Sequence, residues 1–123
     1  MSNSFNVINS EINEIAATDK NVDLKAQIEK LLNSSKVVLF MKGNAEMPQC
    51  GFSANSVAIL KNLGVAFNTF NILNDSEIRQ GLKEYSNWPT FPQLYIKGQL
   101  IGGNDIITEM YKNGELQDIL KNN

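Results

Sequence analysis

The sequence predicts a single α/β domain in which a mixed four-stranded sheet lies between layers of helices. The prediction rests on two observations: the element order helix, strand, helix, strand, helix, strand, strand, helix, and short apolar runs that alternate with helical apolar spacing. A chain of 123 residues, 42% of them hydrophobic and 20% charged, can bury an ordinary core without disulfides or a structural metal.

The first half of the domain predicts two parallel strands around a helix. Asp23 can cap an earlier helix that ends near residues 33–34, and the apolar run 37–41 is typical of a strand buried on both faces. A second helix stops at Gly64, and residues 65–72 follow as the next strand. Strands joined through a helix should be parallel, because a crossover connection returns the chain in the same direction.

The second half predicts another helix and then a hairpin. Asn74 or Asp75 caps this helix, which reaches about Tyr85. A strand over residues 94–96 meets a tight turn at Gly98, so the last two strands should pair as antiparallel neighbours.

The last strand ends at residues 102–103, where Asp105 opens a final pair of helices that is broken near Gly114. The parallel pair and the hairpin together give the mixed four-stranded sheet between helix layers. This is the thioredoxin-like arrangement, and no internal repeat or low-complexity tract competes with it.

Residues 1–21 differ in composition from residues 22–123, and we interpret them as an N-terminal extension of the domain. They are rich in Asn, Ser and acidic residues, whereas residues 22–123 are formally neutral. Four apolar residues between Phe5 and Ile15 would share one face of a helix. The extension is therefore either a frayed terminus or a helix that docks or binds a partner.

Composition and charge argue against several functional classes. The net charge of -2 gives no sign of a nucleic-acid-binding surface, and no apolar stretch is long enough to span a membrane. The first 19 residues contain no Lys or Arg, which argues against a signal peptide or an Arg-rich transit peptide. The unpaired cysteine suits a reducing compartment, and we expect a cytoplasmic protein.

Cys50 carries the whole redox or metal capacity of the chain, because the sequence holds one cysteine and no histidine. One thiol cannot run a Cys-x-x-Cys cycle, and a structural zinc site or an iron–sulfur cluster needs about four ligands. A working Cys50 therefore needs a thiol from outside the chain. Its place before a helix, near Lys42, would lower its pKa, although a buried structural cysteine also fits. Ser53 stands where a resolving thiol would be and cannot resolve a mixed disulfide.

Three further patterns could bind a peptide-like ligand. A cis Phe91–Pro92 bond would turn the main chain outward to pair with an extended peptide, whereas the alternative is a plain turn. Residues 102–105 resemble a glycine-rich entry to a helix, which could hold a carboxylate. Arg79 and Lys83 share a helix face and, with Lys42, could form a second carboxylate pocket. Taken separately, such cations are usually solvated and such glycines usually form a turn.

These patterns combine into four motifs: Lys42-Gly43, Cys50-Gly51-Phe52-Ser53, Trp88-Pro89-Thr90-Phe91-Pro92-Gln93 and Gly102-Gly103-x-Asp105. In this order and spacing they closely resemble the monothiol glutaredoxins with a Cys-Gly-Phe-Ser active site. The resemblance covers roughly residues 22–121. It implies a thioredoxin-like protein that binds glutathione beside the cysteine, with a [2Fe-2S] cluster held by two chains and two glutathiones. Cys50 would then be both the catalytic thiol and the metal ligand.

The resemblance also assigns a role to each part of the glutathione site. The glycyl carboxylate, the cysteinyl unit and the γ-glutamyl end of the peptide would each have their own partners. By family position these are Lys42, Arg79 and Lys83 for the carboxylate, Phe91 ahead of a cis Pro92 for the cysteinyl unit, Asn104 and Asp105 for the γ-glutamyl end, and Thr90 and Phe52 along the wall. The family often has a second cysteine where this chain has Asn104. That second cysteine is not a cluster ligand in the family's usual arrangement.

Two functions are expected from this resemblance. The first is an iron–sulfur carrier in cluster storage, cluster transfer and iron homeostasis, which is a homodimer when cluster-loaded, pairs with BolA-like proteins and delivers to apo recipient proteins. The second is a weak glutathione-dependent oxidoreductase that reduces protein–glutathione mixed disulfides through a Cys50–glutathione adduct. A bare interaction module is hard to reconcile with all four motifs.

Overall fold

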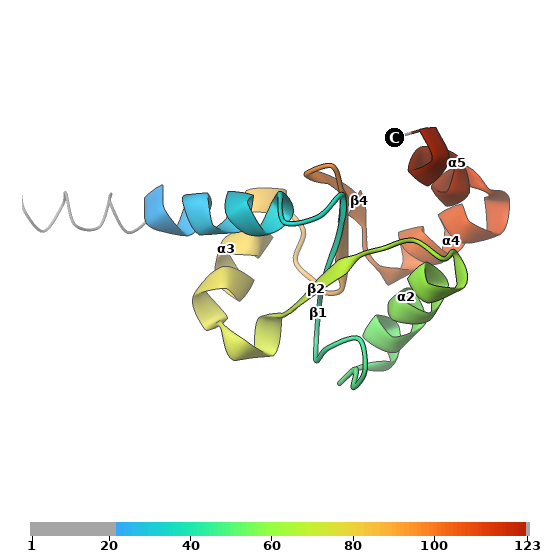
Figure 1. Ribbon diagram of the computed structural model, residues 1–123. Coiled ribbons are helices and arrows are strands. Elements are labelled where there is room, and N and C mark those ends of the chain that lie inside the picture. The colour runs from blue at the N-terminus through green and yellow to red at the C-terminus, as the bar shows by residue number, and fades with distance from the viewer. Residues whose placement is uncertain (1–21, 123) are drawn as a thin grey trace, which may run out of the picture.

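A mixed four-stranded sheet forms the centre of the computed structural model, which describes residues 22–122 (Figure 1). The predicted N-terminal extension, residues 1–21, lies outside the described residues. The strand order is β2-β1-β3-β4. β1 is parallel to β2 and antiparallel to β3, and β3 is antiparallel to β4, which confirms the predicted parallel pair and hairpin. The strands are β1 (Val37–Met41), β2 (Asn68–Asn71), β3 (Gln93–Ile96) and β4 (Gln99–Gly102).

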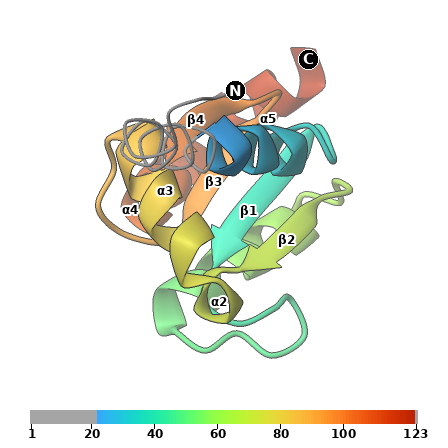
Figure 2. The ribbon, with the colours of Figure 1, turned by 90° about the vertical axis from the view of Figure 1, so that its left-hand side faces the viewer.

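Helices cover both faces of this sheet (Figure 1). The segment 22–32 is helical and lies with α3 on one face, and Figure 2 shows these two helices in front of the strands. The other face carries α2, α4 and α5. The helices are α2 (Gly51–Asn62), α3 (Ser76–Ser86), α4 (Asn104–Asn113) and α5 (Glu115–Asn122), and a short 3-10 turn, η1, spans Ile72–Asn74.

The central strand β1 is buried along its whole length, as its continuous apolar sequence predicts. Successive side chains point to opposite faces of a sheet, so β1 contributes to two cores. Leu39 packs with residues of α2, α4 and α5, whereas Phe40 packs with residues of the helical segment 22–32 and α3. Because both faces hold β1 in place, the end of this strand is a rigid support for the residues that follow it.

Asp75 is the residue that caps α3. Its side chain accepts hydrogen bonds from the N–H groups of Glu77 and Ile78, each at 3.0 Å. These are the N–H groups that a helix start leaves without internal partners. The structure thus selects Asp75 over Asn74, which belongs to η1.

Three predicted boundaries were wrong. The second strand covers Asn68–Asn71 and not residues 65–72. Its pairing with β1 begins only at Asn68, opposite Val38, and it ends where the side chain of Asn71 accepts the N–H of Leu73 and turns the chain into η1. Asp23 lies inside a helix rather than at its cap, since residue 22 is already helical. The helix predicted to open at Asp105 begins one residue earlier, with Gly103 at its cap.

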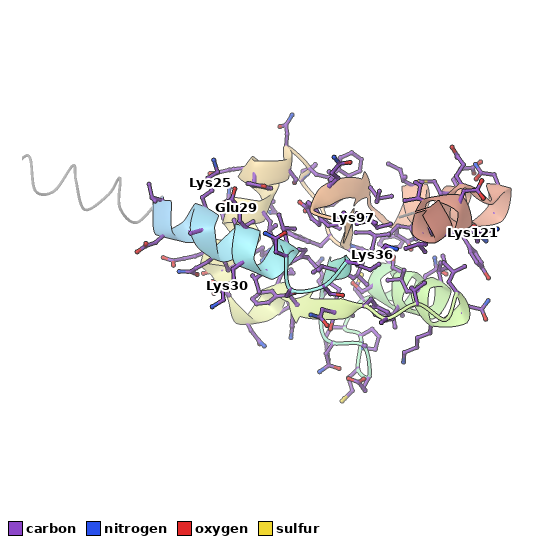
Figure 3. All side chains as sticks on the ribbon, turned by 45° about the horizontal axis from the view of Figure 1, so that its top comes forward. Lys25, Glu29, Lys30, Lys36, Lys97 and Lys121 are labelled. Atoms are coloured by element: carbon purple, nitrogen blue, oxygen red, sulfur yellow. The ribbon has the colours of Figure 1, made fainter. Side chains whose placement is uncertain are left out.

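α5 is attached to the sheet at the amino end of β1, which is the end away from Cys50. The ammonium group of Lys36 donates to the carbonyl of Leu120 at 3.0 Å, and the N–H of Lys97 donates to the carbonyl of Lys36 at 2.7 Å. Figure 3 shows Lys36 and Lys97 next to each other, with Lys121 nearby on α5. Within residues 22–122, no helix is both long and apolar enough to cross a membrane.

Candidate functional site

A pocket of about 570 Å³ lies where the end of β1, the start of α2, α3, the segment before β3 and the start of α4 meet. Every residue that the sequence predicts to bind glutathione contributes to its lining. The lining consists of Lys42, Phe52, Arg79, Lys83, Trp88, Pro89, Thr90, Phe91, Pro92, Gly103, Asn104, Asp105 and Ile106. Cys50 itself is not part of the lining and lies beside it, immediately before the helix that carries Phe52.

Cys50 is a free, half-exposed thiol at the N-cap of α2. The N–H groups of Ser53 and Phe52 at the helix start lower the pKa of the Cys50 thiol below its ordinary value, burial opposes them, and Lys42 adds a weaker lowering. Neither N–H meets the geometry of a capping hydrogen bond to the sulfur, so their effect is that of oriented dipoles around a helix terminus. At a given pH, a larger fraction of Cys50 is therefore the reactive thiolate than for an ordinary cysteine.

Ser53 connects the first turn of α2 to the end of β1. It is 0% exposed, and its side-chain oxygen accepts the main-chain N–H of Lys42 at 3.1 Å. The carbonyl of Lys42 in turn accepts the N–H of Gln49 at 2.8 Å. Ser53 therefore holds the cation-bearing residue and the thiol-bearing helix together, which is a structural role that sequence reasoning did not assign to it.

The loop between β1 and Cys50 is closed by its own hydrogen bonds. The side chain of Asn44 accepts the N–H groups of Glu46 and Met47, and Gly43 adopts a φ of 88°. A Cβ at Gly43 would lie 2.5 Å from the carbonyl of Met47, so only glycine fits this position. The N–H of Gly43 donates to Asn71 at 2.9 Å, a contact between residues too distant in sequence for any local pattern to reveal.

The charged residues of the pocket come from three elements. Lys42 follows β1, Arg79 and Lys83 project from α3, and Asp105 lies in the first turn of α4. The lining thus holds three cations and one carboxylate. Such a pocket suits a ligand that carries more than one carboxylate and a single cation.

The segment before β3 forms the pocket wall between α3 and α4. The Phe91–Pro92 peptide bond is cis, and the sequence alone left its isomer open. The buried side-chain amide of Gln93 donates to the carbonyls of Trp88 at 3.0 Å and Thr90 at 3.2 Å, and so holds this segment in shape. Gln93 belongs to a motif in the sequence, but no sequence pattern revealed this function.

Gly103 lies against Trp88 at the cap of α4. A Cβ at Gly103 would be 3.2 Å from the indole nitrogen of Trp88 and 3.3 Å from the carbonyl of Pro92. That indole N–H is buried and has no hydrogen-bond partner among the described residues. Trp88 therefore lines the pocket and also limits how closely the start of α4 can approach the segment before β3.

One chain offers a single cysteine thiol to a metal. Within residues 22–122, no group of three or more Cys, His, Asp or Glu side chains could hold an ion. A cluster needing about four ligands therefore does not fit one chain, and it fits Cys50 only if other molecules supply the remaining ligands. The half-exposed position of the thiol allows this.

The fold and the site together define a thioredoxin-like protein with one reactive thiol beside a cationic pocket. The chain belongs to the glutaredoxin family, whose model matches residues 37–101. It is 56% identical over 101 residues to an uncharacterized monothiol glutaredoxin (ycf64-like) of Synechocystis, covering 82% of this chain and 94% of that one. It is 63% identical over 95 residues to the chloroplastic monothiol glutaredoxin-S14 of Arabidopsis thaliana, covering 77% of this chain and 55% of that protein.

Solved glutaredoxin structures match the fold of this chain. The solution structure of reduced poplar apo GrxS14 matches with a TM-score of 0.73 and 56% identity, over 80% of this chain and 91% of that chain. The crystal structure of a buckwheat glutaredoxin–glutathione complex matches with a TM-score of 0.69 and 28% identity, over 80% of this chain and 91% of that chain. The chain is therefore a monothiol glutaredoxin in its fold and its single active-site cysteine.

Proposed function

We propose that this chain binds glutathione in the pocket beside Cys50, and that two copies with their glutathiones carry a [2Fe-2S] cluster for delivery to other proteins. The observation that carries the proposal is the pocket itself. Segments far apart in the sequence converge there, and they bring all the residues assigned to glutathione next to the helix that starts after the only thiol.

Glutathione matches the charges of this pocket. It has a carboxylate at each end, an ammonium group and a thiol. The cations Arg79 and Lys83 would receive one carboxylate, and the uncapped N–H groups at the start of α4 would receive the other. Asp105, in that same turn, would pair with the ammonium group. The related buckwheat protein was solved as a glutathione complex, which supports this ligand.

A shared cluster satisfies the ligand count that one chain cannot. Cys50 from each of two chains and the thiol from each of two glutathiones make four sulfur ligands. Near Cys50, the side chains of Met47 and Phe52 are 66% and 62% exposed, so a second copy docking there would cover apolar surface. Glutathione ligands are held without covalent bonds to the protein, so a cluster could leave without unfolding the chain. BolA-like proteins and apo iron–sulfur proteins are the proposed partners.

A weaker oxidoreductase activity is the second candidate, and the lowered pKa of Cys50 favours it. The Cys50 thiolate would attack the glutathione sulfur of a protein–glutathione disulfide and release the protein thiolate. A second glutathione thiolate would then attack the Cys50–glutathione disulfide, giving oxidised glutathione and free Cys50. Ser53, buried and bonded to Lys42, takes no part in this route.

Anaerobic reconstitution with iron and sulfide, with and without glutathione, tests the proposal. We expect visible absorption and a dimer in size-exclusion chromatography only when glutathione is present, and a colourless protein for Cys50→Ser. The matched control Ser76→Ala removes an exposed hydroxyl at the start of α3 and should colour like the wild type. Colour in Cys50→Ser would refute the ligand assignment. A colourless wild type that reduces glutathionylated substrates would favour the oxidoreductase.

A further inference from the structure

Polar side chains join the start of α4 to the first half of α2 at the rim of the pocket. The side-chain oxygen of Asn104 accepts hydrogen bonds from the amide of Asn55 at 2.8 Å and from the hydroxyl of Ser56 at 3.1 Å. The amide of Asn55 also donates to the hydroxyl of Thr108 at 3.0 Å. An Asn amide has two hydrogens, so Asn55 can satisfy both acceptors on α4 at once.

These bonds connect the two helices that frame the functional site. α2 begins directly after Cys50, whereas α4 begins at Asn104 and carries Asp105 into the pocket lining. Asn55 and Ser56 lie in the second turn of α2, close to its thiol-bearing end. The position of the Cys50 thiol at the start of α2 and the position of Asp105 at the start of α4 therefore depend on the same hydrogen bonds.

The hydrogen bonds between α2 and α4 add a directional interaction to the apolar packing of the same two helices. Leu60 of α2 and Ile107 of α4 are both 0% exposed and belong to the same core cluster. Apolar packing holds two helices together, but it depends on buried area and has no preferred direction. Hydrogen bonds weaken steeply when their geometry changes, so they fix the register of the two helix starts. Ser56 is also fully buried, and its hydroxyl would lose its acceptor if Asn104 moved.

We infer that Asn104 is a positioning residue, which sets the distance between the Cys50 thiol and the γ-glutamyl end of bound glutathione through its bonds to Asn55 and Ser56. The inference rests on the proposed function, because it takes glutathione as the ligand of the pocket. It revises the expected role of Asn104. The side-chain oxygen accepts hydrogen bonds from α2, so in this inference the main-chain N–H groups at the uncapped start of α4 are left to contact the ligand.

The chain provides a matched control for this inference. The amide of Asn62 donates to the phenolic oxygen of Tyr111 at 2.6 Å, and it joins α2 to α4 near their opposite ends. Asn62→Ala and Asn55→Ala thus remove the same kind of bond from the same pair of helices. They differ in the position of the lost bonds, at the pocket for Asn55 and at the far ends for Asn62, and in their number, two for Asn55 and one for Asn62.

The test is calorimetric titration of glutathione into the full chain and its variants, with thermal unfolding measured on the same samples. We expect Asn55→Ala to weaken glutathione binding roughly three- to tenfold, because it removes the hydrogen bonds to Asn104 and Thr108 at the start of α4, while Asn62→Ala binds as the wild type does. Both should lower Tm, and Asn55→Ala should lower it more because it removes two hydrogen bonds rather than one. In the Asn55→Ala/Asn104→Ala double variant the losses should be less than additive, because both substitutions remove one shared bond.

The outcomes separate this inference from the proposed function. If the wild type binds glutathione and Asn55→Ala binds it equally well, the positioning role is refuted and the proposed function stands. Equal weakening in Asn55→Ala and Asn62→Ala would also refute it, since general loosening of the helix pair would then explain both. A wild type that binds no glutathione would overturn the proposed function and the positioning role together.

Discussion

The hydroxyl of Ser53 accepts the main-chain N–H of Lys42 at 3.1 Å, and this bond ties the thiol-bearing helix to the central strand. Ser53 is 0% exposed, so its hydroxyl is not in contact with bulk water in the folded chain. We predict that Ser53→Ala lowers the free energy of unfolding by about 1–2 kcal/mol, because it leaves a partly buried N–H without a partner. Urea unfolding measures this as a lower midpoint with an unchanged slope.

Ser76→Ala is the matched control for that stability measurement, because the Ser76 side chain is exposed at the start of α3. It should change the free energy of unfolding by no more than about 0.5 kcal/mol. A Ser53→Ala protein as stable as the Ser76→Ala protein would show that the bond to Lys42 contributes nothing.

The pH dependence of Cys50 alkylation should be shifted to lower pH. The N–H groups of Ser53 and Phe52 favour the thiolate, so the pKa of Cys50 is lowered in the folded chain. A thiol in an unfolded chain titrates at about 8.5, and the alkylation rate follows the thiolate fraction. The folded protein should therefore reach its half-maximal rate at a lower pH than the same protein in urea. If the folded protein and the protein in urea had the same midpoint pH, the N–H groups would not lower the pKa of Cys50.

Lys42 should affect this profile only slightly, because it is the weakest of the groups that lower the pKa of Cys50. Lys42→Gln should move the midpoint upward, since it removes a positive charge that favours the thiolate. The shift should be smaller than the difference between the folded and the unfolded protein. A downward shift in Lys42→Gln would contradict the sign of this interaction.

Gly103→Ala should disturb the pocket through Trp88. The added Cβ would lie 3.2 Å from the indole nitrogen and 3.3 Å from the carbonyl of Pro92, so these groups must move apart. Trp88 is the only tryptophan, so its fluorescence reports the displacement directly. We expect a changed emission spectrum and several-fold weaker glutathione binding. Gly51→Ala, where nothing lies within 4 Å of an added Cβ, should leave the spectrum unchanged.

The cations of α3 should make glutathione binding sensitive to salt. Arg79→Gln and Lys83→Gln should each weaken it a few-fold at low ionic strength, and the loss should shrink as salt screens the interaction. Lys112→Gln, an exposed cation in the last turn of α4, removes the same charge away from the pocket and serves as the control. Equal losses in all three variants would indicate a general charge effect and no carboxylate site.

The sequence predicted the fold because its strongest signals are local. The apolar run of β1, the Asp75 cap and the glycine turn of the hairpin each act over a few residues. The length of β2 was predicted wrongly for a related reason. Its apolar neighbours favour a longer strand, but residues 65–67 do not pair with β1, and at the other end the side chain of Asn71 accepts the N–H of Leu73 and ends the strand.

The pocket was predictable only as a set of motifs, and its internal contacts were not. Residue types and order identified what would converge, and the structure shows that these residues line one cavity. The bonds from Asn55 and Ser56 to Asn104 join residues 49 and 48 positions apart, and each of these side chains taken alone is an ordinary polar residue on a helix. Asn104 lines the pocket as its position suggested, but the sequence did not predict that its side-chain oxygen accepts hydrogen bonds from α2.

Native mass spectrometry of the anaerobically reconstituted protein tests the shared cluster directly, because it counts the components of the complex. We expect one species whose mass equals two chains, two glutathiones and one [2Fe-2S] cluster, with no such species for Cys50→Ser. A cluster bound to a single chain, or to two chains without glutathione, would refute the shared cluster.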